Sequence, residues 1–438
     1  MTSANTPIHQ LHTQLRNGSS TPRSVMEDSL YRANGNASHN TYLTIDAALA
    51  LDEAAALAAR YPDATLRPAL FGVPISVKDC FDISGMVTSC GSRFYATHNL
   101  PASADSGIVQ RLRQAGAILP GKTHLHQLAY GITGENRDYG DCVQPENAGL
   151  LTGGSSSGAA ASVQEGSAMA AIGTDTGGSV RVPAALCGLA GYRTSHGIGP
   201  WDGGYHLAPS FDTLGILFRD LRDGPLLAEA IFHIQRIDAS LPTARIGYVD
   251  TDFLHDATPE VLATYAAWKA ALQNYGAVLS PIDTTAWADS LEIFAGIQAH
   301  EAAAIHRGNF AHFEESIAAR LVWGESLSAK FVQALRRRHD VFRARLRSLF
   351  QQYDFLIAPC APVHTLAVGA DHSKTRPAIL RYTTPISLAG LPIIALTSGA
   401  AGAHRGAGVQ LIGAHNRDAQ LLAYAAGLAD SLLGNSDK

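Results

Sequence analysis

The sequence predicts an α/β protein built around one large sheet. Strand-like runs of Val, Ile and Leu alternate along the chain with helical runs rich in Ala, Leu and Glu. Such alternation is typical of a sheet that carries helices on its faces. The 438 residues are 46% hydrophobic and only 16% charged, which is enough apolar material for a large core. Because no linker, charge run or internal repeat divides the chain, we expect a single α/β unit over residues 1–438.

The first third of the chain is expected to start with helices and then to alternate. Residues 1–60 read as helical, most clearly over 46–60, where strong helix formers dominate. The later segments are the strand FGVPISV (71–77), the helix SGIVQRLRQAG (106–116), the strand AIL (117–119) and HLHQLAYG (124–131), which has the pattern of a helix start.

The remaining elements follow a Gly/Ser-rich stretch, which runs directly into the apolar segment VRVPAALCGLAGYR (180–193) and is therefore expected to be buried. Strands are expected at 245–249, 354–359, 392–397 and 408–413, and helices near 259–275, across 290–350 and over 417–432.

Charge and cysteine usage narrow the classes of function. The formal charge of −5 and the pI of about 6.4 give no basic surface for nucleic acid, and the cluster Arg336–Arg338 is interpreted as a solvated helix face. Five widely spaced cysteines without a CxxC pair are typical of reduced thiols. No signal segment or membrane-spanning run is evident. We therefore expect a cytoplasmic protein with no nucleic-acid or membrane partner; a homodimer is compatible with the sequence.

The Gly/Ser-rich stretch between Gly153 and Pro183 is the strongest indication of function. Ser155 and Ser179 each follow a Gly-Gly pair. Glycines before a serine permit unusual backbone conformations and leave N–H groups unscreened beside the hydroxyl, as a nucleophile with an oxyanion hole requires. A flexible linker is the alternative interpretation of this composition. The Ala, Val and Ile residues between the glycines disfavour a linker.

A nucleophilic serine needs a base within hydrogen-bond reach. The chain has 18 histidines, but no spacing ties one of them to Ser179, and there is no G-x-S-x-G elbow. Lys78 follows the apolar strand of GVPISVKD, where burial would lower the pKa of its amine toward a useful value. From the residues alone, the choice between histidine and lysine stays open.

Three segments, GVPISVKD, GGSSSG and TDTGGSVRVPA, resemble the amidase signature family of serine hydrolases. AGAILPGKT, GLAGYRTSHG, SFDTLG, DFLIAP, SLAGLP and GVQLIG are also similar to segments of that family, so the resemblance covers nearly the whole chain. It implies a large, mixed, twisted β-sheet covered by α-helices on both faces. Helices of residues 1–60 would pack on a catalytic core of about 65–220, and the remainder would complete the sheet and the substrate pocket.

The resemblance also implies a Ser-Ser-Lys triad of Lys78, Ser155 and Ser179, with the two serines 24 positions apart as in the family. In this scheme Ser179 attacks the amide carbonyl. Ser155, held in a cis peptide after Gly154, relays the proton to neutral Lys78. No cofactor or metal is implied.

Other residues around Ser179 have supporting roles by the same resemblance. Backbone N–H groups of the turn Thr176–Ser179, which includes Gly177 and Gly178, would form the oxyanion hole. Asp175 and Arg181 would hold the loop by hydrogen bonds.

Two rival motifs suggest other chemistry. GAILPGKT (116–123) satisfies the G-x-x-x-x-G-K-[ST] pattern of a nucleotide hydrolase, but the strand lies inside the motif and Pro120 removes one N–H donor. His124 and His126 could point to one side of a strand and bind a metal, but their surroundings favour packing histidines.

Within the family, the glutaminase-type component of the amidotransferase that corrects mischarged tRNA is the alternative to a stand-alone amidase. That relative holds the glutamine ammonium with an acidic residue where this chain has Leu380. The sequence therefore favours a stand-alone amidase with a small-molecule amide substrate less charged than glutamine. Arg320 lies near where relatives hold a substrate carboxylate. Departures at Thr152, Gln127 and Thr397, and variable segments near 125–150, 200–210 and 290–330, leave aryl, aliphatic, amino-acid and urea-type amides all open.

Overall fold

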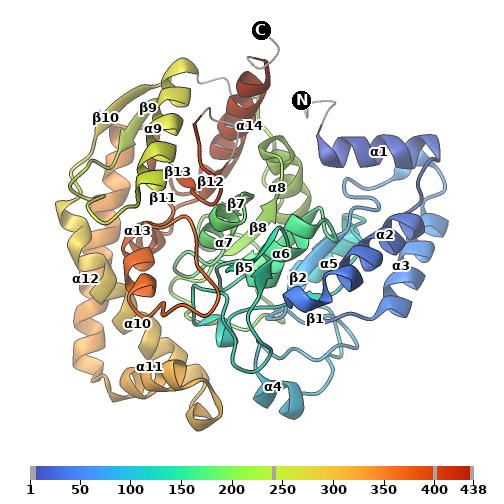
Figure 1. The fold of residues 1–438 in the computed structure, drawn as a ribbon, viewed down its shortest axis with the longest axis horizontal. Helices are drawn as coiled ribbons and strands as arrows, with labels where there is room; N and C mark the ends of the chain where they lie inside the picture. Colours follow the sequence, from blue (N-terminus) through green and yellow to red (C-terminus); the bar gives the residue numbers. More distant parts are fainter. Residues whose placement is uncertain (1–5, 239–242, 398–401, 435–438) are drawn as a thin grey trace.

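The chain folds around a long mixed sheet, as the sequence predicts. The computed structural model describes residues 6–238, 243–397 and 402–434. Among these residues eleven strands form one sheet, which crosses the whole molecule (Figure 1). In spatial order the strands are β1 (Tyr42–Thr44), β3 (Lys122–Thr123), β2 (Ile75–Lys78), β6 (Ala170–Thr174), β8 (Leu214–Phe218), β7 (Ala190–Arg193), β12 (Ile393–Leu396), β13 (Val409–Gly413), β11 (Phe355–Pro359), β9 (Arg245–Tyr248) and β10 (Val278–Pro281).

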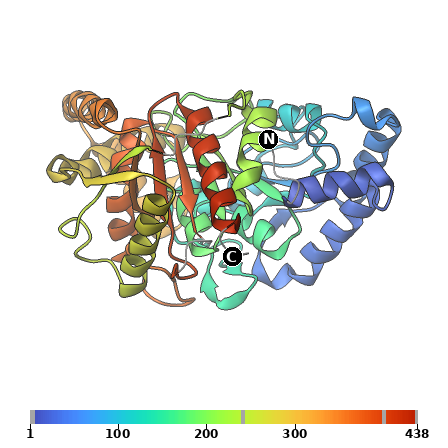
Figure 2. The same cartoon turned by 90° about the horizontal axis from the view of Figure 1, so that it is seen from above.

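Helices cover both faces of the sheet (Figure 2). They are α1 (Pro7–Asn17), α2 (Pro22–Gly35), α3 (Ala47–Arg60), α4 (Arg93–His98), α5 (Gly107–Gln114), α6 (Ser157–Glu165), α7 (Arg181–Leu186), α8 (Gly224–Phe232), α9 (Pro259–Asn274), α10 (Ser290–Ile305), α11 (Glu315–Ser326), α12 (Ala329–Ser348), α13 (Thr375–Ala389) and α14 (Asp418–Gly434). None of the described helices is long and apolar enough to cross a membrane.

Strand β13 shows how the two faces are covered. Its Gln410 side chain hydrogen-bonds Arg181 of α7, whereas a Cβ on Gly413 would meet Leu421 of α14. Residues an odd number of positions apart in a strand point to opposite faces. Helices α7 and α14 therefore lie on opposite sides of the sheet.

The N-terminal helices begin and end where the sequence signals them. Thr6 caps α1, with its side chain accepting from the N–H of His9, and Gly18 ends that helix in the left-handed conformation. Thr21 and Ser24 form a reciprocal capping box at the start of α2. Residues 1–5 and 435–438, which the single-unit prediction includes, lie outside the described residues.

Three local expectations differ from the structure. Residues 42–44 form the edge strand β1 instead of continuing the N-terminal helices. The apolar run 117–119 makes only an isolated bridge between Ile118 and Pro74, and the strand forms further on, as β3. The segment 124–131 does not start a helix: it makes one 3-10 turn at Gln127–Ala129, in which Leu128 has a φ of 57°. There the Leu128 N–H donates to the Cys90 carbonyl, a tertiary contact that overrides the local pattern.

Candidate active site

The Lys78 amine is fully buried at the end of β2 and lies among three hydroxyl groups. Its Nζ is 2.8 Å from Ser155 Oγ, 2.8 Å from Thr174 Oγ1 and 3.1 Å from Ser156 Oγ. Burial lowers the pKa of Lys78 to about 8, although nearby acidic groups act in the opposite direction. A neutral amine has two N–H groups and one lone pair, so it can donate to two of these hydroxyls and accept from the third. This environment suits a lysine that works as a base.

The two Gly-Gly-Ser segments lie side by side. The N–H of Ser156 donates to the Ser179 carbonyl at 3.2 Å, and the N–H of His126 donates to the Ser155 carbonyl at 3.2 Å. The peptide between Gly154 and Ser155 is cis, as the resemblance implies. Both serines are buried, and Ser179 stands in the turn between β6 and α7.

Ser179 opens onto a small cavity with about 240 Å³ of empty space. The walls of this cavity come from segments far apart in the sequence, including α10 and α13 of the C-terminal half. The cavity leaves little room beside the serine. The lining residues are Ala129, Tyr130, Gly131, Ile132, Thr176, Gly177, Ser179, Leu207, Gln298, Arg376 and Leu380.

Only some N–H groups of the predicted oxyanion turn are free of hydrogen bonds among the described residues. The N–H of Gly178 donates to Asp175 Oδ1 at 2.8 Å and is therefore already used. Within the described part of the chain, the N–H groups of Thr176, Gly177 and Ser179 have no acceptor. Of the predicted set, these three are the donors available to a developing oxyanion.

The turn Thr176–Ser179 is fixed from two sides by residues that the sequence analysis did not name. Thr176 Oγ1 donates to Asp212 Oδ1 at 2.6 Å, and Thr383 Oγ1 donates to the Gly177 carbonyl at 2.5 Å. Asp212 lies in SFDTLG, which the sequence marked only as a family-like segment. Its position beside the turn depends on the pairing of β6 with β8.

Asp175 anchors the loop that carries Ser179. Its carboxylate accepts from the Arg181 guanidinium at 2.8 and 3.0 Å and lies 3.3 Å from Nε of Arg193. Burial raises the pKa of Asp175, but the charges and hydrogen bonds of the two arginines outweigh it and hold this pKa well below its ordinary value. The sequence analysis did not identify Arg193 as a site residue. Its position at the end of the apolar run 180–193 is a usable signal, because a buried guanidinium needs a carboxylate partner.

A match to a known protein family includes the residues of this candidate site. The chain matches the family model described as Amidase over residues 24–422, which is most of its length and includes all three proposed triad positions. The chain belongs to the amidase family. Like other amidase-family hydrolases, it acts on C–N bonds.

Several relatives of this amidase have names that describe their own activities. AtzE of Pseudomonas sp. (strain ADP), named as one subunit of 1-carboxybiuret hydrolase, is 32% identical over 415 residues, with 87% of this chain and 88% of the relative covered. One subunit of the glutamyl-tRNA(Gln) amidotransferase of Chromohalobacter salexigens is 30% identical over 466 residues, with 95% of each chain covered. A crystal structure of an amidase has a TM-score of 0.88 at 29% identity, and the match covers 97% of this chain and 100% of the other.

The segment GAILPGKT (116–123), which matches the nucleotide-hydrolase pattern, does not form a phosphate site in this amidase. Lys122 is fully buried, with its Nζ 2.6 Å from Asp79 Oδ1 and 2.7 Å from Thr88 Oγ1. The short strand β3 pairs with β2 at this point, where a phosphate-binding loop would open a helix. The lysine is therefore not available to a nucleotide.

The two nearby histidines of the amidase do not act as a pair. Nδ1 of His124 lies 2.8 Å from Ser157 Oγ, and its Nε2 lies 2.9 Å from the Gly140 carbonyl, so both ring nitrogens already have partners. Nδ1 of His126 is buried without a partner. Across the described ranges, no three His, Cys, Asp or Glu side chains are grouped so as to hold a metal ion.

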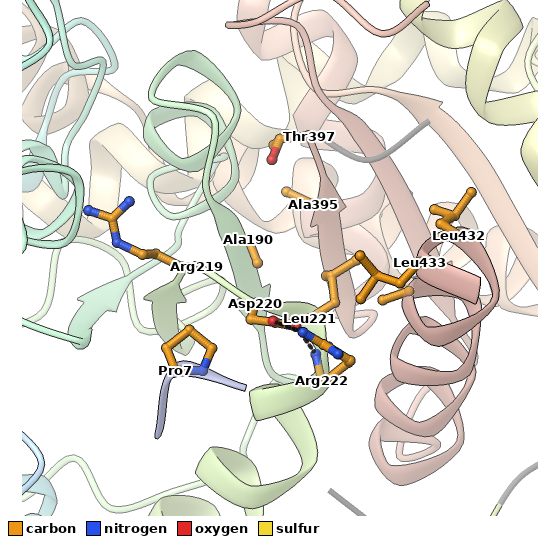
Figure 3. A pocket seen from close by; sticks show the side chains of 11 residues that line it. Pro7, Ala190, Arg219, Asp220, Leu221, Arg222, Ala395, Thr397, Leu432 and Leu433 are labelled. Atoms are coloured by element: carbon orange, nitrogen blue, oxygen red, sulfur yellow. Dashed lines mark hydrogen bonds and ion pairs between the residues drawn. The ribbon is translucent and has the colours of Figure 1, made fainter. Parts of the chain in front are cut away.

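Figure 3 shows a larger hollow in the amidase, with about 880 Å³ of empty space. It is lined by Ala190 at the start of β7 and by Arg219 just after β8. Ala170 of β6 and Ala190 of β7 both pair with Phe218, at the end of β8 beside the hollow. Thr174, near Ser179, pairs with Leu214 at the other end of β8. The hollow is therefore separate from the candidate active site.

Proposed function

We propose that this chain hydrolyses a linear amide of a small molecule to a carboxylic acid and ammonia or an amine, through an acyl-enzyme on Ser179. The observation that carries the proposal is the buried Lys78 amine, which is hydrogen-bonded to Ser155 at 2.8 Å in the segment that contacts the Ser179 backbone. An amine in this environment can accept a proton near neutral pH.

Acylation follows from this arrangement. The Ser179 hydroxyl attacks the amide carbonyl and passes its proton to Ser155, whose own proton moves to Nζ of Lys78. The carbonyl oxygen becomes an oxyanion and is stabilised by free N–H groups of the turn Thr176–Ser179. The tetrahedral intermediate then expels the amine, which takes a proton back through Ser155 from Lys78.

Deacylation repeats the same steps with water. Water loses a proton through Ser155 to Lys78 as it attacks the ester carbonyl of the acyl-enzyme. Ser179 leaves with that proton, the acid is released, and the three side chains return to their starting protonation states.

We further propose that the chain works without the other components of a tRNA-dependent amidotransferase. Leu380 is buried in the cavity wall, at the position where the resemblance to the glutaminase-type component would require a carboxylate for the glutamine ammonium. An ammonium buried there without a partner would be costly. The names of two relatives nevertheless describe parts of larger enzymes, so glutamine hydrolysis within a complex is the second candidate function.

The test measures ammonia or amine release by the purified chain from aliphatic, aryl, amino-acid and urea-type amides, glutamine included. We expect Lys78→Ala, Ser155→Ala and Ser179→Ala each to lower kcat by about a thousandfold or more. Ser326→Ala is the matched control, because the exposed Ser326 hydroxyl bonds the Trp323 carbonyl within α11 and contacts none of the three proposed residues. Full activity in Ser179→Ala would refute the acyl-enzyme, and turnover of glutamine alone would favour the second candidate.

A further inference from the structure

Among the described residues that line the cavity beside Ser179, Arg376 is the one that carries a charge. It lies in the first turn of α13, where a cation opposes the positive end of the helix dipole. The fold therefore places a guanidinium in the substrate cavity against a local electrostatic cost.

The guanidinium of Arg376 has no counter-charge in the described part of the chain. No carboxylate there lies within ion-pair distance of it, and its Nε is buried without an acceptor. Burial, followed by the neighbouring charge of Arg320, lowers the pKa of Arg376 to about 10. The Arg376 side chain is partly buried, and withdrawing an unpaired cation from water even in part is costly, so Arg376 has unused capacity to bind an anion.

Arg320 of α11 lies behind the cavity wall and adds a second positive charge. Its guanidinium stacks 4.6 Å from the centre of the Tyr130 ring and donates to the Tyr130 carbonyl at 2.8 Å. Its Nε is also buried without an acceptor. Burial lowers the pKa of Arg320, and the Glu314 carboxylate opposes this shift from beyond ion-pair distance.

The third group in this cluster is His126, which contributes no negative charge. It packs under the cavity wall so closely that a Cβ on Gly131 would lie 2.1 Å from its ring. Burial and then the charges of Arg320 and Arg376 hold the pKa of His126 well below its ordinary value, so the ring is neutral. The cluster thus holds two cations and unpaired nitrogen atoms, with no anion among them.

We propose that Arg376, supported by Arg320, binds a carboxylate of the substrate, so that the amide cleaved at Ser179 belongs to a small molecule with a negatively charged end. This inference rests on the proposed function and names the substrate class of the same site. A carboxylate matches the planar donor fork of a guanidinium. Because the cavity is small, the carboxylate and the amide are separated by a few carbon atoms, as in a monoamide of a short dicarboxylic acid.

The test compares kcat/KM for succinic and glutaric monoamides with kcat/KM for the corresponding neutral diamides. We expect the wild-type chain to prefer the monoamides, and Arg376→Gln to reduce that preference by about 10- to 100-fold, the usual effect of losing a charge-assisted bond. Arg376→Lys should recover part of the preference. Lys374→Gln is the matched control, because Lys374 is an exposed cation at the same end of α13.

A second readout does not depend on turnover. Succinate or glutarate should raise the Tm of the wild-type chain but not that of Arg376→Gln. Without any ligand, Arg376→Gln should unfold at the same or a higher temperature than wild type, whereas a structural arginine would leave a less stable protein. Equal loss of monoamide and diamide hydrolysis in Arg376→Gln, or no dicarboxylate effect on the wild-type Tm, would overturn the assignment. If dicarboxylates bind only in the presence of Arg376 while no amide is cleaved, the anion site stands and the proposed function fails.

Discussion

The Lys78 side chain divides its hydrogen bonds among three hydroxyl groups and has no carboxylate at ion-pair distance within the described residues. Exclusion of water, which destabilises the charged amine, is the largest influence on its pKa. Lys122, on the neighbouring strand β3, is equally buried but lies 2.6 Å from Asp79. The two buried lysines therefore differ in that Lys122 has a counter-ion at ion-pair distance and Lys78, among the residues that the structure describes, does not.

The protonation of Lys78 predicts the pH dependence of the reaction. Only the neutral amine can accept the serine proton, and the pKa of Lys78 is about 8. The value of kcat/KM should therefore be low at pH 6, rise through a midpoint near 8 and level off above it. A succinic or glutaric monoamide is a suitable substrate, because its carboxylate does not titrate in this range. A rate that falls between pH 6 and pH 8 would contradict the role of Lys78.

The buried ion pairs of Asp175 predict how a substitution at this residue changes the free energy of unfolding. In Asp175→Asn, the guanidinium groups of Arg181 and Arg193 would stay buried without their carboxylate. We expect this change to lower the free energy of unfolding by about 3–5 kcal/mol, as for other buried pairs that lose one partner. Urea denaturation measures the loss. Asp371→Asn, which removes an exposed carboxylate, should leave the free energy of unfolding close to that of the wild type. Equal stability of the two variants would contradict the anchoring role.

At the scale of elements, close packing shapes the turn between β6 and α7. A Cβ on Gly177 would lie 2.6 Å from the Phe294 ring, and Gly178 has a φ of 122°. Helices α10 and α13 thus press against the turn, and glycine is needed there for space as well as for backbone conformation.

Gly177→Ala is expected to disturb this turn. Its methyl group must displace Phe294, so we expect kcat to fall by at least about tenfold, since small displacements near reacting atoms are costly. Gly35→Ala is the control, because Gly35 is exposed at the end of α2 with no atom within 4 Å of the added Cβ. Steady-state kinetics of both variants test the prediction, and unchanged activity in Gly177→Ala would exclude tight packing of the turn.

Most elements could be predicted from the sequence because their patterns are locally consistent. The helix over 46–60 forms as α3 with an Asp46 cap, and the strands near the C-terminus lie within a residue of their expected bounds. The segment 124–131 could not be predicted, because its conformation depends on contacts with Cys90 and Ser155 that are far away in the sequence. Arg376 could not be predicted for the same reason, because its proposed role requires α13 to lie beside the Ser179 turn.

At the scale of the whole molecule, the candidate site joins the two halves of the chain. Lys78 and Ser179 come from the N-terminal half, while Arg181 is hydrogen-bonded to Gln410 and to the Thr383 carbonyl of the C-terminal half. Strands from both halves share one sheet. The shared sheet supports a single domain over residues 1–438. This domain assignment stays a prediction.

The core also determines how the five cysteines should react. All five are buried and free, and burial raises the pKa of each thiol. A thiol reagent such as DTNB should therefore label fewer than about one group per native chain and all five after denaturation in guanidinium chloride. Fast labelling of the native protein would show that the core opens more readily than its packing indicates.

Different turns of helix α13 contact different parts of the candidate site. Its first turn supplies Arg376 to the cavity, and its later turns supply Thr383 and Ser387 to the loop that holds Ser179. With the roles proposed above, natural selection can exchange residues in the first turn, and with them the preferred substrate, while the later turns keep their contacts with the Ser179 loop. The same separation makes positions 375–380 a compact target for laboratory evolution of new substrate ranges.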